Sequence, residues 1–271
     1  MALEKMADGA PAAEKLGWRL GMQAYTFNRF TFFEAIDKTE SLGLRTIEAF
    51  PGQRLSADHG DAVIDHNMDA ALYPAVREKL AAADVKLACY GVVALSSAEA
   101  ESRRVFDFAK AMGIETIVSE PALDAFDLLD KLTAEYGITV ALHNHPTPSF
   151  YWNPDTVLDA IAGHSEMIGS CSDTGHWMRS GVDPLDALRK LEGRIVSLHM
   201  KDLNKFGTMD CHDVPFGQGE GNIRGCLEEL LRQGVGAVFS IEYEHNWDDS
   251  VPEIAEGVKY FDQVAAELTA G

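Results

Sequence analysis

Short apolar segments alternate eight times with longer amphipathic segments along this chain. Strands are expected over residues 20–24, 46–50, 86–90, 116–120, 139–143, 168–172, 196–200 and 238–243. Helices are expected over residues 31–41, 73–83, 97–112, 123–136, 154–161, 184–191, 223–233 and 252–268. Strands that are apolar on both faces and separated by helices are typical of a parallel sheet that is covered by helices.

Eight strand-helix units predict an α/β protein with the fold of a (β/α)8 TIM barrel, in which residues 19–271 form a single domain. The 271 residues provide about 34 for each unit, which suits this fold. The alternative, an open doubly wound sheet, usually carries a glycine-rich nucleotide loop after its first strand, and residues 23–26 contain no glycine. Residues 1–18 lack the apolar run of a secretory signal, and we expect them to form a loose extension.

The balance of charge argues against several classes of partner. The chain has 43 acidic and 23 basic residues and a formal net charge of −20, which disfavours binding to nucleic acid and to anionic lipid surfaces. Its apolar runs are far shorter than the ~20 residues that cross a bilayer. The four cysteines have no paired spacing, so neither a disulfide framework nor a zinc knuckle is expected. We therefore predict a cytoplasmic protein without nucleic-acid or membrane partners.

Charged and imidazole side chains recur where the expected strands end. They are Glu48, Glu120, His143 with His145, Asp173 with His176, His199 with Lys201, and Glu242 with Glu244. The carboxyl ends of barrel strands meet at one mouth, and a buried charge there is costly unless it is paired or bound to a metal. Carboxylate and imidazole ligands without cysteine suit a catalytic divalent cation, namely Mn²⁺, Mg²⁺, Co²⁺ or Zn²⁺. The long polar connections 51–72 and 203–221 are expected to cover a substrate at this mouth.

Several of these segments also resemble a known family. The segments are Asp173-Thr174-Gly175-His176, residues 197–202, residues 218–223 and Ile241-Glu242-Tyr243-Glu244. In this order they resemble the sugar phosphate isomerase/epimerase superfamily, whose members have a xylose isomerase-like TIM barrel. The resemblance spans residues 20–268 and implies that Asp173, His199 and Glu242 are metal ligands.

The fourth ligand is open. Relatives usually have a glutamate at the end of strand five, where this chain has His143, while Glu120 ends strand four. We favour Glu120 as the ligand with His143 beside it, because a further carboxylate would better balance an ion of charge +2.

The resemblance implies a divalent-metal-dependent isomerase or epimerase, with Mn²⁺ as the preferred ion. Such an enzyme removes a proton next to a carbonyl of a ketose or keto-sugar and forms a metal-stabilised enediolate. We assign His145 as the general base and Glu242 as the second candidate, with Lys201 as a further catalytic group. The candidates for contact with the substrate are Glu48, His176, Trp177, Tyr25 and Glu244, although His176 could instead orient a ligand.

Three other functions compete with this interpretation. A dehydratase or hydratase acting on an inosose or a 3-keto-glycoside would begin with the same proton abstraction. A DNA-repair endonuclease is disfavoured by the charge and by residues 88–91, where strand three ends without a histidine. A non-catalytic sugar-binding barrel is the third. Glycines 217, 219 and 221 could cradle a phosphate, but Arg224 is the one cation near them in sequence, so no phosphorylated substrate is predicted. Pairing of two copies of the chain is left open.

Overall fold

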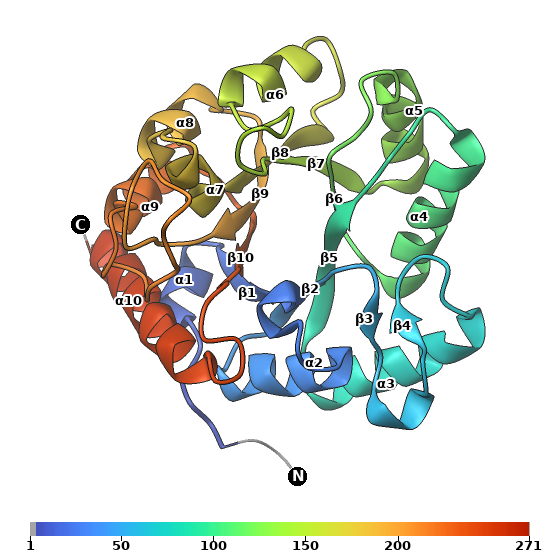
Figure 1. Ribbon diagram of the computed structural model, residues 1–271, viewed down its shortest axis with the longest axis horizontal. Coiled ribbons are helices and arrows are strands. Elements are labelled where there is room, and N and C mark those ends of the chain that lie inside the picture. The colour runs from blue at the N-terminus through green and yellow to red at the C-terminus, as the bar shows by residue number, and fades with distance from the viewer. Residues whose placement is uncertain (1–3, 271) are drawn as a thin grey trace.

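The computed structural model describes residues 4–270, and it is a closed barrel of eight parallel strands surrounded by helices (Figure 1). Around the barrel the strands follow the order β1, β10, β9, β8, β7, β6, β5 and β2. Their bounds are β1 (Arg19–Gln23), β2 (Thr46–Ala49), β5 (Lys86–Val93), β6 (Thr116–Ser119), β7 (Thr139–His143), β8 (Ile168–Asp173), β9 (Ile195–Met200) and β10 (Val238–Ile241). The predicted (β/α)8 TIM barrel is thereby confirmed.

Eight helices lie outside the strands where the apolar pattern predicts them, and their ends differ from the expected ones by three residues or fewer. The start of α2 is fixed by a capping box between Thr31 and Glu34, and α4 and α5 end at left-handed Gly113 and Gly137. The bounds are α2 (Phe32–Ser41), α3 (Tyr73–Ala82), α4 (Glu99–Met112), α5 (Phe126–Tyr136), α6 (Pro154–Ala160), α8 (Pro184–Lys190), α9 (Ile223–Arg232) and α10 (Val251–Ala270).

Several short elements in the connections were not expected. Helix α7 (Thr174–Arg179) begins directly after β8, and Asp173 caps it by accepting the backbone N–H of His176. Strands β3 (Gln53–Arg54) and β4 (Val63–Ile64) form an antiparallel pair in the connection after β2. Three 3-10 helices complete the set: η1 (Ala24–Phe27), η2 (Ala57–His59) and η3 (Ala70–Leu72).

Residues 11–18 pack against the barrel, which differs from the loose extension expected for residues 1–18. Helix α1 (Pro11–Lys15) contacts α10, and Asp262 of α10 accepts the backbone N–H groups of Ala12 and Ala13 at 2.6 and 3.1 Å. Trp18 is buried against Phe239 and Phe261. Small alanine side chains permit this close packing, which composition alone did not reveal. Residues 1–3 lie outside the described part of the chain.

The core has two parts, and the smaller one lies inside the barrel. Ala88, Cys89, Val118, Ala141, Cys171 and Val238 form this small cluster, which is separate from the main core. Between residues 4 and 270 the four cysteines are free. Within the same residues, none of the helices has the length and apolar character needed to span a membrane.

Candidate active site

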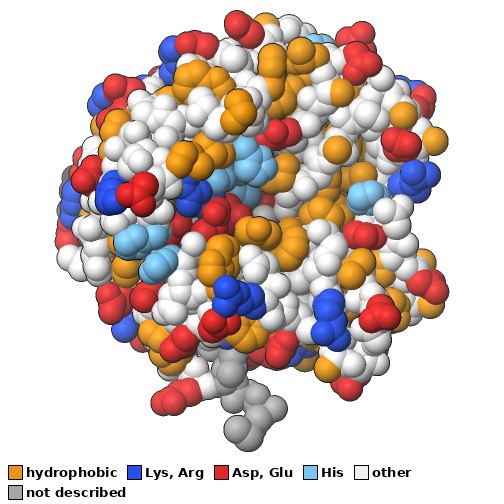
Figure 2. Space-filling view, in the orientation of Figure 1, with side chains coloured by type: hydrophobic (Ala, Val, Ile, Leu, Met, Phe, Trp, Pro, Cys, Tyr) orange, Lys and Arg blue, Asp and Glu red, His pale blue; other side chains and the backbone are white. Residues whose placement is uncertain are grey.

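A cavity of about 410 Å³ opens at the mouth where the strands end at their carboxyl sides. Figure 2 shows a hollow near the centre of this face, with acidic and histidine side chains inside and hydrophobic ones around it. The lining residues come from distant parts of the chain: Gln23, Tyr25, Phe50, Pro51, Gly91, Val92, His145, His176, Glu242 and Glu244.

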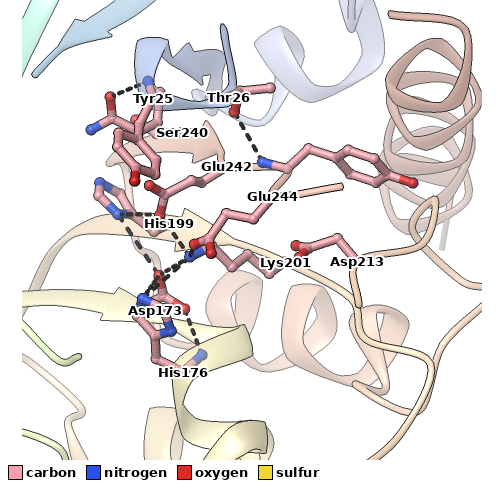
Figure 3. A network of polar contacts seen from close by, with 12 residues as sticks. Tyr25, Thr26, Asp173, His176, His199, Lys201, Asp213, Ser240, Glu242 and Glu244 are labelled. Atoms are coloured by element: carbon pink, nitrogen blue, oxygen red, sulfur yellow. Dashed lines mark hydrogen bonds and ion pairs between the residues drawn. The ribbon is translucent and has the colours of Figure 1, made fainter. Parts of the chain in front are cut away.

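Lys201 lies at the centre of the charged cluster beside this cavity. Its Nζ is 2.5 Å from Glu244 Oε1, 2.8 Å from Glu242 Oε2 and 3.0 Å from Asp173 Oδ2 (Figure 3). Burial disfavours the ammonium, but these carboxylates outweigh it and raise the pKa of Lys201 well above its usual range. Burial likewise opposes ionisation of Asp173 and Glu242, yet neighbouring positive charge holds the pKa of both well below the usual range. The cluster therefore contains ionised groups of both signs.

His199 connects this cluster with the buried Glu48 inside the barrel. Its Nε2 is 2.9 Å from Glu48 Oε1, and its Nδ1 is 3.2 Å from Glu242 Oε2 and 3.8 Å from Asp173 Oδ2. Burial disfavours the cationic ring, but Cys171 and the two glutamates outweigh it and raise the pKa of His199. The side chains of Asp173, His199 and Glu242 thus converge, as the strand-end pattern predicts.

Several buried polar atoms in this cluster make no hydrogen bond. They are both ring nitrogens of His143 and Nδ1 of His199. His143 Nε2 lies 3.5 Å from Asp173 Oδ2. One ligand atom from each of His143, Asp173, His176 and Glu242 lies within 4.8 Å of all the others. Because unpartnered buried polar atoms are costly, this donor set fits a divalent cation.

A second group of potential ligands contains Glu120, His143 and His145. Glu120 Oε1 is 2.5 Å from His145 Nδ1 and 3.8 Å from His143 Nδ1, and Ser149 Oγ donates to Glu120 Oε2 at 3.1 Å. Burial disfavours the cationic His145 ring, but Glu120 outweighs it and raises the pKa of His145. Glu120 is therefore engaged with His145, and it is His143 that shares a ligand group with Asp173 and Glu242.

Comparison with known proteins identifies the family of this chain. The sequence profile described as xylose isomerase-like TIM barrel matches residues 36–264. The chain belongs to this family.

Two solved structures have the same barrel. A putative uncharacterized protein from Parabacteroides distasonis is 31% identical, with a TM-score of 0.74 over 91% of this chain and 99% of that one. A D-tagatose 3-epimerase-like protein is 17% identical, with a TM-score of 0.72 over 93% of this chain and 100% of that one, a likeness that shows the fold alone. Inosose dehydratase 2 from Bacillus cereus is 29% identical over 86 residues, which are 32% of this chain and 29% of the dehydratase.

In this xylose isomerase-like barrel, three residues lie away from the positions expected for substrate or catalytic contact. Trp177 is fully buried in the main core and does not line the cavity, since one step along α7 turns its side chain away from that of His176. Glu48 is also fully buried, and it accepts hydrogen bonds from Gln23 Nε2 and Ser240 Oγ. Lys201 lies beneath the cavity wall, where it contacts Glu242 and Glu244.

Three of the residues expected to contact the substrate do line the cavity of this barrel, namely Tyr25, His176 and Glu244. Tyr25 is 42% exposed, and its ring meets those of Phe50 and Trp247 edge to face, with centroids 5.2 and 6.0 Å apart. Glu244 lines the same wall and contacts Lys201. Tyr25 and Phe50 together give the cavity an aromatic border, against which the C–H face of a sugar ring could pack.

Two residues near the mouth, the largely buried Arg179 and the buried Asp213, were missed by the sequence analysis. Arg179, the last residue of α7, approaches His176 Nδ1 with Nη1 at 2.9 Å and Asp213 Oδ2 with Nη2 at 3.3 Å. Asp213 is fully buried in the connection after β9, and burial, together with nearby Glu244, raises its pKa to about 7. No strand-end pattern points to either residue, because one belongs to the unexpected helix and the other to a loop.

The glycine-rich segment after β9 binds a carboxylate of the chain itself. Asp202 accepts backbone N–H groups from Gly217, Gly219 and Gly221 at 2.8, 3.0 and 2.9 Å. A Cβ at position 219 would lie 2.3 Å from Asp202 Oδ1, which explains the need for glycine there. The donors that could have cradled a phosphate are therefore already in use.

Proposed function

We propose that this protein is a divalent-metal-dependent sugar isomerase or epimerase that abstracts a proton next to a carbonyl of a ketose or keto-sugar. The observation that carries the proposal is the set of buried ring nitrogens of His143 and His199 that make no hydrogen bond and lie next to the carboxylates of Asp173 and Glu242, beside a cavity. The residues that would hold the ion are His143, Asp173, His199 and Glu242. Such an ion, with Mn²⁺ as our choice, supplies a Lewis acid that stabilises negative charge on substrate oxygens.

His143 replaces Glu120 as the proposed fourth ligand. The Glu120 carboxylate already has hydrogen bonds with His145 and Ser149, whereas neither ring nitrogen of His143 makes a hydrogen bond. Metal content of purified variants tests this choice. We expect His143→Gln and Asp173→Asn to lose the ion and Glu120→Gln to keep it; loss of metal from Glu120→Gln alone would reverse the assignment.

His145 is the proposed general base. It lines the cavity, and Glu120 holds its Nδ1, which leaves Nε2 free to accept a proton. Glu242 also lines the cavity, but the positive charge of Lys201 holds the pKa of its carboxyl well below the usual range and makes it a weaker base. Lys201 is assigned to positioning Glu242 and Glu244, since it does not line the cavity.

A dehydratase acting on an inosose or a 3-keto-glycoside is the second candidate. The 86-residue match to an inosose dehydratase favours it, and the reaction begins with the same removal of a proton beside a carbonyl. The two candidates differ only after that step, because elimination expels a hydroxyl group and epimerisation returns the proton.

One experiment tests both candidates. The protein with Mn²⁺ is incubated in deuterated water with free ketoses, an inosose and 3-keto-glycosides, and NMR follows deuterium exchange beside the carbonyl. We expect exchange with at least one substrate class, and an epimer, isomer or enone identifies the reaction. His145→Ala should slow exchange by about 100-fold or more while the metal stays bound.

His164→Ala is the matched control for that variant. His164 lies in the connection between α6 and β8, at the opposite end of the barrel from the cavity, and it pairs with Asp130 of α5. Its exchange rate should equal that of the wild type. Exchange that survives removal of the metal by a chelator, or that is absent for every substrate, would overturn the proposed function.

A further inference from the structure

The His176 ring lies between two positively charged donors. Arg179 Nη1 is 2.9 Å from its Nδ1, and Lys201 Nζ is 3.3 Å from its Nε2. A neutral imidazole has one lone pair available for a hydrogen bond, because its other nitrogen carries the proton. Only one of the two contacts can therefore be a hydrogen bond to His176.

The other partners of Lys201 and Arg179 indicate which of the two donates a hydrogen bond to His176. Lys201 has three N–H groups, and three carboxylate oxygens lie closer to it than His176 does, at 2.5, 2.8 and 3.0 Å. Hydrogen bonds from an ammonium to carboxylates are stronger than those to a neutral acceptor. Arg179 can only donate, and Nη1 has its nearest partner in His176, with Glu244 Oε2 farther away at 3.6 Å. The lone pair on Nδ1 therefore receives the guanidinium N–H.

We infer that Arg179 is a positioning residue that fixes His176, which lines the cavity, as a neutral Nε2–H donor. A ring with protons on both nitrogens would face a cation on each side, Arg179 at 2.9 Å and Lys201 at 3.3 Å, so the neutral ring is favoured. A nitrogen that carries a proton cannot ligate a metal, so this assignment removes His176 from the candidate ligands. Resting on the proposed function, it makes His176 the donor to a substrate oxygen on which negative charge develops.

Asp213 positions Arg179 in turn. Its Oδ2 is 3.3 Å from Arg179 Nη2, and its backbone forms a bridge with Leu203 at the start of the connection after β9. Asp213 is fully buried, and the side chain of Arg179 is 10% exposed, so water cannot replace these contacts freely. The connection that we expected to cover the substrate thus also holds an arginine behind the cavity wall.

Long-range ¹H–¹⁵N NMR of the imidazoles tests this inference on the full chain, because its cross-peak pattern distinguishes the two neutral tautomers and the cation. The chain is labelled with ¹⁵N-histidine and kept free of metal with a chelator, and His176→Asn assigns the signals. The wild type should show one neutral tautomer for His176, with the proton on Nε2. Arg179→Met should lose that single pattern and show the Nδ1–H tautomer, a mixture or the cation.

Arg29→Met is the matched control, since Arg29 pairs with Asp248 at the exposed rim. Its His176 pattern should equal that of the wild type. A wild-type ring with its proton on Nδ1 or on both nitrogens overturns the inference, and so does an unchanged pattern in Arg179→Met. The wild-type spectrum decides even if Arg179→Met does not fold.

Asp213→Asn is the second variant, and an unchanged single tautomer there removes Asp213 from the inference. The measurement needs neither substrate nor turnover, so its failure is distinct from failure of the proposed function. Once a substrate is identified, Arg179→Met should lower kcat by about 10–100-fold, as is typical when a residue that orients a substrate-contacting group is lost.

Discussion

Lys201 and Asp202 are neighbours in sequence, both are buried, and each is surrounded by three partners of a different kind. Three side-chain carboxylates surround Lys201, whereas three backbone N–H groups surround Asp202. Side-chain partners can turn toward a bound ion or substrate, but backbone partners are fixed by the course of the loop. Two consecutive residues after β9 thus have different roles: Lys201 belongs to the candidate site, and Asp202 anchors the glycine-rich loop.

The largest expected effect comes from Lys201→Met, which leaves three carboxylates without their shared cation. Without a divalent ion, the free energy of unfolding should fall by about 3–5 kcal/mol, as is typical when one partner of a buried ion pair is removed. Mn²⁺ should restore much of this loss, because an ion held by Asp173 and Glu242 supplies positive charge at the same place. Urea unfolding with Mn²⁺ or with a chelator measures both values, and a loss that Mn²⁺ leaves unchanged would contradict the exchangeable role of these carboxylates.

Asp202→Asn sharpens the contrast with its neighbour. An asparagine keeps one oxygen, so its NH₂ group must face N–H groups of the glycine loop. We expect a loss of about 2–3 kcal/mol in the free energy of unfolding, the cost of leaving buried donors unsatisfied. Mn²⁺ should shift this variant no more than it shifts the wild type in the same urea titration. Selective recovery with Mn²⁺ would mean that the glycine loop is coupled to the ion site.

Asp213 is a third buried ionisable residue, and it has neither three carboxylates nor three backbone N–H groups around it. One of its oxygens faces Arg179, and the other makes no hydrogen bond. Its pKa of about 7 lies above the ordinary value, so between about pH 4 and 7 the folded chain retains a proton that the unfolded chain has lost. The free energy of unfolding should therefore fall as pH rises through this window. We expect Asp213→Asn to lack about 1–2 kcal/mol of that fall, allowing for the ion pair with Arg179. Parallel pH series in urea measure the difference, and identical series would show that Asp213 ionises at its ordinary pKa.

Glu244→Gln is expected to have the smallest effect. It removes one of the three charges around Lys201 but keeps an amide oxygen as acceptor, and Glu244 is partly open to the cavity. The free energy of unfolding should fall by about 0.5–1.5 kcal/mol. Thermal unfolding beside Glu256→Gln, an exposed carboxylate on α10 whose side chain accepts from Gln218, provides the control. A loss as large as that of Lys201→Met would show that the three carboxylates are not shared as the geometry indicates.

Local patterns account for what the sequence predicted well. The apolar periodicity that placed eight strands and eight helices depends on neighbours a few residues apart, and convergence of Asp173, His199 and Glu242 follows from the barrel itself. Helix α7 was missed because Asp173-Thr174-Gly175-His176 looks like the end of a strand, and glycine in a first turn conceals a helix. The direction of Trp177 and the place of Arg179 depend on that helix.

Long-range partners account for the rest. Neither the pairing of Glu120 with His145 nor the capture of Asp202 by three glycines could be inferred from spacing, because each depends on where a loop returns. Charge balance favoured Glu120 as the fourth ligand, yet the closeness of His145 and Ser149 gives that carboxylate other partners. The family resemblance identified residue types that recur at strand ends, but it contained no information on which loop residues come to lie beside Glu120 and Asp202.

The carboxylate of Asp202 within the glycine loop bears on substrate selection. Barrels of this fold often grip a phosphoryl group with the loops after their last strands. Here an internal anion fills that grip, tethered to the same chain and thus present at a high effective concentration. A sugar phosphate reaching this loop would have to displace it and then share a strongly acidic protein with another negative group. On the proposed function, we therefore expect the enzyme to prefer uncharged sugars to sugar phosphates.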